Sequence, residues 1–117
     1  MEVLDISKIK KKIQEIVDAR DWNQFHSPKN LAVSLSIEAG ELLENFQWLS
    51  DSEELSPEKL QAVRDEMADV LYHLIRLADV LKIDLNEAFW EKLKKSEAKY
   101  PVELSYGNAK KYTEFIK

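Results

Sequence analysis

The chain has 117 residues, of which 44% are hydrophobic and 33% charged, a balance that predicts one globular domain rather than a disordered chain. It contains no cysteine, which excludes a disulfide framework and a thiolate zinc site. The formal net charge of -5 argues against a nucleic-acid polymer as partner, because binding to a phosphate backbone requires a basic surface.

The first half of the chain predicts two helices. Only 2 glycines and 3 prolines occur, mostly where helical patterning breaks, so the predicted fold class is all-α. Apolar residues at helical spacing predict a helix over about residues 5–20. Residues 20–26 carry aromatics without a clear period and are expected to form a loop. Ser27 followed by Pro28 is a helix start signal, and the apolar stripe after it continues to about Trp48.

The second half predicts two more helices. Residues 49–56 are rich in Ser, Asp and Glu and mark a turn, after which Ser56 and Pro57 repeat the start signal for a helix of roughly 24 residues. Asp84 with Glu87 forms a capping box for a fourth helix, which ends before Pro101. Residues 102–117 are expected to be irregular or to hold one short helix. No repeat or linker divides the chain, so residues 1–117 are predicted to form a single domain.

The sequence gives no sign of a membrane location. No apolar run approaches the roughly 18 to 20 residues that a membrane span needs. Residues 1–12 mix acidic and basic side chains and lack the apolar stretch of a secretory signal. We therefore expect a cytoplasmic protein with no membrane partner.

Two acidic pairs stand inside helices that are otherwise apolar. Glu38 and Glu41 lie three residues apart in one segment, and Glu66 and Asp69 lie three apart in another. Residues at this spacing are neighbours on one helix face, so each pair presents two carboxylates side by side. Carboxylates so near a buried face are costly unless they are paired or bind a metal.

Oxygen ligands of this kind suit Mg²⁺ or Mn²⁺. The chain lacks the Glu-x-x-His pattern on two helices that a di-iron bundle requires. The competing interpretation is that both pairs belong to the solvated faces of a Glu-rich helical protein. Residue spacing alone leaves both interpretations open.

The sequence around the acidic pairs resembles a known family. Glu38-x-x-Glu41, 24 intervening residues and Glu66-x-x-Asp69 resemble the signature of the MazG-like, all-α nucleotide pyrophosphohydrolases. The strings "ARDWNQFHSPKNLAVSLSIEAGELLENFQW", "DEMADVLYHLIRLADVLKIDL" and "KYPVELSYGNAKKYTEF" are similar to the dCTP pyrophosphatase branch of that family. The resemblance extends from about residue 18 to residue 115, and it implies a fold of the four-helix-bundle type.

The resemblance also implies an activity, the hydrolysis of a (deoxy)nucleoside triphosphate to the monophosphate and pyrophosphate, and hence a role in nucleotide-pool sanitation. Mg²⁺ held by the four carboxylates, with Mn²⁺ as a substitute, would neutralise phosphate oxygens and polarise a water for attack at the α-phosphorus. One of the four, with Glu41 as a candidate, would also act as general base. Neither the sequence nor the resemblance chooses among them.

A base-binding site is implied by matches to family positions at Trp22, His26, Asn30 and Trp48. The resemblance suggests that the two tryptophans enclose the nucleobase, since an indole face stacks on any base. The alternative places both in the core or in an interface. His26 is expected to position its loop or to contact substrate rather than to ligate metal, because no second histidine lies at ligand spacing.

Phosphate binding would fall to basic residues late in the chain. Lys92 and Lys99 match a family pattern that ends in Tyr-Pro, and Lys111 and Tyr112 match its tail. The alternative for each lysine is an ordinary solvated helix surface. Lys92 is the first to test.

Three positions depart from the family pattern. Ser96 stands where the family usually has asparagine, which predicts a weaker or water-mediated contact to sugar or phosphate. His73 stands where close relatives tend to have tyrosine, and Ile13 where some have histidine. His73 is interpreted either as a core residue or as a substrate contact. The preference for dCTP or a related or modified pyrimidine nucleotide is therefore a separate question from the chemistry.

Two long helices with wide apolar stripes exceed what one small bundle can cover, and the resemblance implies a homodimer or homotetramer with a site shared between subunits. Two alternatives to this enzyme remain. One is a non-enzymatic helical partner-binding protein, and the other is a metal-dependent hydrolase of another phosphoanhydride, such as dUTP or a nucleotide-sugar. Release of pyrophosphate from a nucleotide panel only when Mg²⁺ is present separates an enzyme from a binding module, and the same panel separates a dCTP enzyme from the other hydrolase.

Overall fold

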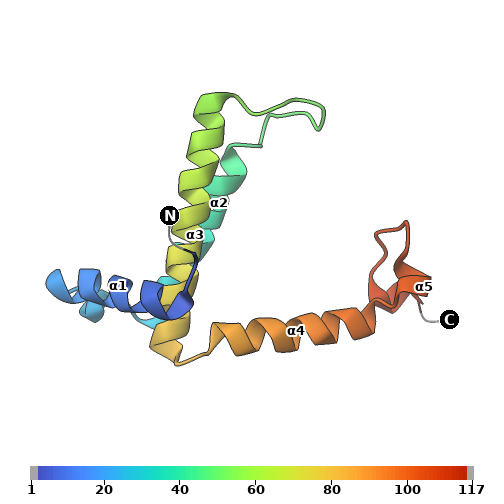
Figure 1. Cartoon of the computed structure of the whole chain (residues 1–117). Helices are drawn as coiled ribbons and strands as arrows, with labels where there is room; N and C mark the ends of the chain where they lie inside the picture. Colours follow the sequence, from blue (N-terminus) through green and yellow to red (C-terminus); the bar gives the residue numbers. More distant parts are fainter. Residues whose placement is uncertain (1–2, 116–117) are drawn as a thin grey trace. The chain divides into compact units, whose positions relative to one another are not determined.

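The computed structural model describes residues 3–115, and every regular element in that part of the chain is a helix (Figure 1). The elements in chain order are α1 (Ile6–Ala19), the 3₁₀ turn η1 (Asn23–Phe25), α2 (Pro28–Glu44), α3 (Pro57–Leu81), α4 (Leu85–Lys99), α5 (Val102–Ser105) and the 3₁₀ turn η2 (Tyr112–Phe115). The all-α prediction is confirmed for these residues. None of the described helices has the length and apolar character needed to cross a bilayer.

The helices begin where the sequence signals predicted. The Oγ of Ser27 accepts a hydrogen bond from the backbone N–H of Asn30 at 3.1 Å, and the Oγ of Ser56 accepts one from Lys59 at 3.2 Å. In both helices proline occupies the first turn, where its missing N–H costs nothing. Asp84 caps α4 in the same way, by accepting a hydrogen bond from the Glu87 N–H at 3.1 Å.

Helix α2 ends earlier than its apolar stripe. The stripe predicted a helix to about Trp48, but the helix ends at Glu44 and residues 45–48 form turns. The cause is Asn45, whose side-chain amide donates to the carbonyl oxygen of Glu41 at 3.2 Å. This bond satisfies a carbonyl that has no partner at a helix end, so the chain can leave the helix there.

Contacts between Cα atoms divide the chain into two compact units, and the first is Met1–Ile83. In it α2 and α3 lie side by side, and α1 packs against α3 (Figure 1). The buried apolar side chains are Ile13, Val17, Leu31, Val63, Ile75 and Ala78. Ile13, which stands where some relatives have histidine, is therefore a core residue of this chain.

The second unit, Asp84–Lys117, contains α4, α5 and η2. The Tyr100 ring meets the rings of Tyr112 and Phe115 edge-on, with centroids 6.0 and 5.9 Å apart. These contacts fold the end of the described chain back onto the end of α4. The described part of the tail thus holds one short α-helix, which was one of the two predicted alternatives, and in addition a 3₁₀ turn; residues 116–117 lie outside the described residues. The single domain and the four-helix bundle stay predictions.

Candidate metal and nucleotide site

The two acidic pairs meet between α2 and α3. One carboxylate oxygen from each of Glu38, Glu66 and Asp69 lies within 4.8 Å of the others. Glu41 belongs to the same cluster, because it is one of the neighbours that raise the pKa of Glu66. The packing of α2 on α3 thus joins the pair on one helix to the pair on the other.

Burial makes this carboxylate cluster electrostatically costly. Glu38 and Glu66 are half-buried, and among the described residues their Oε2 atoms have no hydrogen-bond partner. Burial, followed by the neighbouring Glu38 and Glu41, raises the pKa of Glu66 from 4.5 to about 7. Each effect penalises the ionised form. At neutral pH the cluster therefore favours either a shared proton or a bound cation.

The donor set fits a hard divalent cation. Carboxylate oxygens are the ligands that Mg²⁺ and Mn²⁺ prefer, and two of those present are buried without a partner. A cation among the oxygens would offset both their mutual repulsion and their lost hydration. The residues therefore fit a metal site, and its ligands would be Glu38, Glu66 and Asp69 with Glu41 beside them.

His73 lies one turn after Asp69 on α3. Its Nδ1 is 2.8 Å from the backbone carbonyl oxygen of Asp69, and its ring meets the Tyr72 ring edge-on with centroids 5.1 Å apart. Because a carbonyl only accepts, Nδ1 carries a proton in this hydrogen bond. The ring is half-buried, which is compatible with both predicted roles, a core residue and a substrate contact.

The predicted base-site residues near the start of α2 are held by local bonds. The Asn30 side-chain amide donates to the Phe25 carbonyl oxygen at 3.0 Å, which fastens the turn η1 to α2. Trp22 is 41% exposed, and its ring centroid lies 6.4 Å from that of His26. His26 accepts a 3.0 Å hydrogen bond at Nδ1 from Nε of Arg76 on α3. Asn30 thus supports the loop, while Trp22 offers an accessible ring.

Sequence reasoning did not single out Arg76, although in the structure it hydrogen-bonds to Asn23 and His26, in the segment that also carries Trp22. The available signal was an arginine between Ile75 and Leu77, inside the apolar stripe of the longest predicted helix. A buried cation in such a position requires partners. Helical periodicity does not say which segments supply them.

Trp48 lies beyond the other end of α2 and is 85% exposed. The 17 residues of α2, at about 1.5 Å each, place about 26 Å of helix between the Trp22 segment and the Trp48 segment. One chain therefore does not bring the two tryptophans together. Any pocket that used both would need a second copy of the chain.

The predicted phosphate-binding residues lie in the second unit. Lys92, Ser96 and Lys99 share one face of α4, because they are four and three residues apart. The Lys99 ammonium lies 4.7 Å from the centre of the Tyr112 ring, in cation–π geometry. The backbone N–H of Lys111 donates to Glu114 at 3.2 Å. The structure thus joins Lys99 to Tyr112, and the phosphate-binding role of this set stays a prediction.

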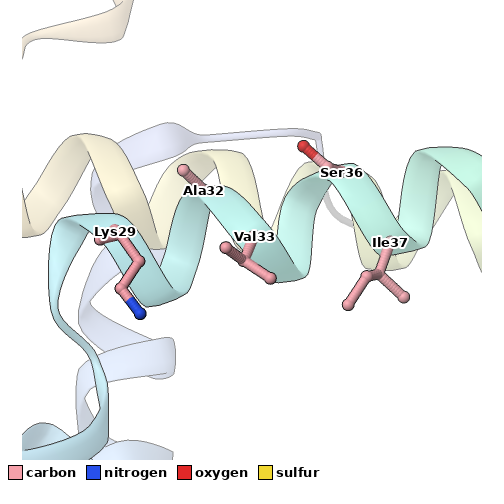
Figure 2. Close-up of a pocket in the computed structure, with 5 residues that line it drawn as sticks. All are labelled: Lys29, Ala32, Val33, Ser36 and Ile37. Carbon is pink, nitrogen blue, oxygen red and sulfur yellow. The ribbon is translucent and has the colours of Figure 1, made fainter.

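A shallow hollow of about 450 Å³ lies along α2 (Figure 2). Val33 and Ile37 point to the same side of the helix in Figure 2, and both are about half exposed, at 49% and 56%. The residues that line the hollow are Lys29, Ala32, Val33, Ser36 and Ile37. It contains none of the four clustered carboxylates, so it is a separate apolar surface.

The chain is similar to several known proteins. Residues 33–115 match the MazG-like family. The chain is 43% identical over 104 residues to dCTP pyrophosphatase 1 of Mus musculus and 40% identical over 104 residues to that of Homo sapiens, which covers 86% of this chain and 61% of each relative. The chain thus spans about three fifths of the length of these curated relatives.

A crystal structure of a pyrophosphatase from Archaeoglobus fulgidus is also similar, with a TM-score of 0.78 and 41% identity. The matched region covers 86% of this chain and 96% of the chain in that crystal structure. Two neighbouring helices of this all-α protein bring their carboxylates together. The protein thus belongs to the class of helical proteins that could hold a metal ion through oxygen ligands. Within that class the chain belongs to the MazG-like family. The resemblance read from its motifs is confirmed.

Proposed function

We propose that the chain is a Mg²⁺-dependent nucleoside triphosphate pyrophosphohydrolase that acts on dCTP or on a related or modified pyrimidine nucleotide. The observation that carries the proposal is the carboxylate cluster, in which the Oε2 atoms of Glu38 and Glu66 are buried without hydrogen-bond partners among the described residues. The names of its relatives, dCTP pyrophosphatase 1 and a pyrophosphatase, support the choice of reaction and base.

The chain's carboxylates perform two tasks in this reaction. Glu38, Glu66 and Asp69 hold the cation, which when bound neutralises phosphate oxygens and polarises the attacking water. A carboxylate beside them accepts a proton from that water as its oxygen attacks the α-phosphorus and the bond to the pyrophosphate leaving group breaks. Glu41 is the candidate base, since it adjoins Glu66 and is exposed to water.

A homodimer or homotetramer completes the proposal. Large apolar side chains on α2 and α4, among them Val33, Ile37, Phe89 and Trp90, are exposed in one chain. A second copy of the chain packed against these side chains would remove their apolar surface from water. Assembly would also supply a Trp48 from one copy to a Trp22 from another, which one chain does not do.

The deciding experiment is a panel of the eight common nucleoside triphosphates and 5-modified dCTP, with pyrophosphate release measured with Mg²⁺ and with EDTA. We expect release only with Mg²⁺, and fastest from a cytosine nucleotide. dUTP is added to the panel, and a nucleotide-sugar is assayed by release of the nucleoside monophosphate, because its cleavage yields a sugar phosphate rather than pyrophosphate. Faster hydrolysis of either one than of the cytosine nucleotides would reassign the substrate. No release from any nucleotide with Mg²⁺ present would favour a non-enzymatic partner-binding protein and refute the proposal.

A further inference from the structure

Arg76 is a buried cation that ties two segments, α1 and the Trp22–His26 segment, to α3. Its side chain is only 3% exposed. The guanidinium donates from Nη1 to Gln14 Oε1 at 2.5 Å, from Nη2 to Asn23 Oδ1 at 2.9 Å and from Nε to His26 Nδ1 at 3.0 Å. These acceptors come from α1, from η1 and from the residue that follows η1. One side chain therefore fixes how the Trp22–His26 segment lies on the helix that carries Glu66 and Asp69.

Two carboxylates balance this buried charge. The amides of Gln14 and Asn23 each give their carbonyl oxygen to Arg76 and donate their N–H to Asp18 Oδ1 at 2.7 Å. The hydrogen bonds from Asn23 and Gln14, with the charge of Arg76, lower the pKa of Asp18. Oδ2 of Asp79 lies 3.8 Å from Nη1 of Arg76. The network is thus satisfied from both sides, which a buried ion requires.

This geometry fixes the protonation of His26. Arginine only donates, because its guanidinium has no acceptor and stays charged at any ordinary pH. The bond from Arg76 Nε therefore needs an unprotonated Nδ1 on His26, and the neutral ring then carries its proton on Nε2. Burial, followed by the charges of Arg76 and His73, lowers the pKa of His26 from its ordinary value. The neutral form therefore prevails at pH 7.

The Nε2–H of His26 makes no hydrogen bond to any residue in the described part of the chain, and the ring is only half-buried. Its centroid lies 6.4 Å from that of Trp22, which is 41% exposed, and the Arg20 guanidinium lies 5.7 Å from the centre of the Trp22 ring. An indole face supports stacking of a planar base, and an N–H at its edge pairs only with an acceptor atom. Pyrimidines carry such acceptors in their ring carbonyls.

We propose that Arg76 is a positioning residue that locks His26 as a neutral Nε2–H donor beside Trp22, so that the site selects a ligand with a hydrogen-bond acceptor there. The positioning of His26 stands on the protein alone, whereas the selection of an acceptor rests on the proposed nucleotide activity. Arg76 itself touches no reacting atom. Because Nδ1 is occupied by Arg76, it is not available as a metal ligand or as a general base.

The first test is made on the wild-type protein and needs no nucleotide. Nitrogen-15 NMR of the folded protein at pH 7 distinguishes the protonated from the unprotonated ring nitrogens of its two histidines. A His73→Gln variant serves only to assign the two sets of signals. We expect His26 to be neutral, with its proton on Nε2. A proton on Nδ1, or a cationic ring, would overturn the inference even in an active enzyme.

The second test separates positioning from simple support of the fold. Arg76→Met should raise the KM for the preferred nucleotide about tenfold and change kcat less, because the carboxylates keep their places while the donor loses its orientation. Arg76→Lys keeps the charge and one donor nitrogen, so we expect a KM between those of the wild type and Arg76→Met. A purely structural role would lower the active fraction, and hence kcat, at unchanged KM.

Arg64→Met is the matched control, since Arg64 lies on the same helix with an exposed side chain. It should leave both the NMR signals of His26 and the KM as in the wild type. If Arg76→Met does not fold, Arg76→Lys and the wild-type tautomer still decide the case. A wild-type protein with the expected tautomer that releases no pyrophosphate would refute the proposed function while supporting the positioning of His26.

Discussion

Glu66 is both partly buried and close to other carboxylates of the cluster. Its pKa is raised to about 7 by burial and by Glu38 and Glu41, and its Oε2 has no hydrogen-bond partner among the described residues. A side chain that is costly for the protein alone and useful with a cation is typical of a functional site. Replacing Glu66 by a neutral residue should therefore lower the activity of the chain and raise its stability without metal.

Glu66→Gln tests this opposition. We expect kcat/KM for Mg²⁺-dependent pyrophosphate release to fall at least about 100-fold, because a metal ligand worth several kcal/mol in the transition state is lost. In EDTA at pH 8 the variant should melt at a higher temperature than the wild type, since an ionised carboxylate no longer faces its neighbours. Exposed Glu44 on α2 provides the control Glu44→Gln, which should do neither. A lower melting temperature in EDTA would contradict the electrostatic account.

His26 predicts a pH dependence of stability. Its folded-state pKa is lowered by burial, Arg76 and His73, so the unfolded chain takes up a proton first as the pH falls. The stability linked to neutral His26 is thus present above the unfolded value of 6.5 and is lost as the pH falls below it. We expect the wild type to lose melting temperature relative to His26→Gln between pH 7.5 and pH 5, as measured in EDTA. A constant difference would be evidence against this linkage.

Helix boundaries show what the sequence could predict at the scale of elements. The starts of α2, α3 and α4 followed from Ser27, Ser56 and Asp84, because a cap acts on the residues next to it. The end of α2 did not follow, because the apolar stripe ran on while the Asn45 side chain bonded to the helix end. Local polar bonds thus decided a boundary that hydrophobic periodicity missed.

The cap at Ser56 can be measured directly. Ser56→Ala removes the acceptor for the Lys59 N–H, and we expect the free energy of unfolding to fall by about 1 kcal/mol. Exposed Ser52, in the preceding loop, gives the matched control Ser52→Ala, with a much smaller effect. Denaturant unfolding followed by circular dichroism measures both. The activity of Ser56→Ala well below its melting temperature should equal that of the wild type, because Ser56 lies outside the carboxylate cluster.

The candidate site was predictable to the extent that it depends on short-range spacing. Residues three apart must share a helix face, so the pairing of Glu38 with Glu41 and of Glu66 with Asp69 was fixed before any packing was known. The contacts of Arg76 join residues 50 to 62 positions apart, as for His26 and Gln14, and no periodicity encodes them. The separation of Trp22 from Trp48 likewise became visible only once α2 had defined ends.

The exposed apolar surfaces lead to a prediction about how copies of the chain assemble. If a second copy covers the hollow along α2, then Val33→Asp places a charge in that interface, at a cost that should shift assembly toward smaller species. Sedimentation velocity at micromolar concentration should show a dimer or tetramer for the wild type and a smaller species for the variant. The control is Lys11→Glu, an exposed change on α1. A folded, active wild-type monomer would refute the assembly.

The carboxylate cluster joins two helices that one loop connects, and this has a consequence for how the chain opens. Without a divalent cation, repulsion acts between α2 and α3, so local separation of these helices costs less than global unfolding. A cation bound by both helices must leave before they part, so it raises that opening energy with its concentration. Amide hydrogen exchange in α2 and α3 should therefore slow with added Mg²⁺, even when no nucleotide is present.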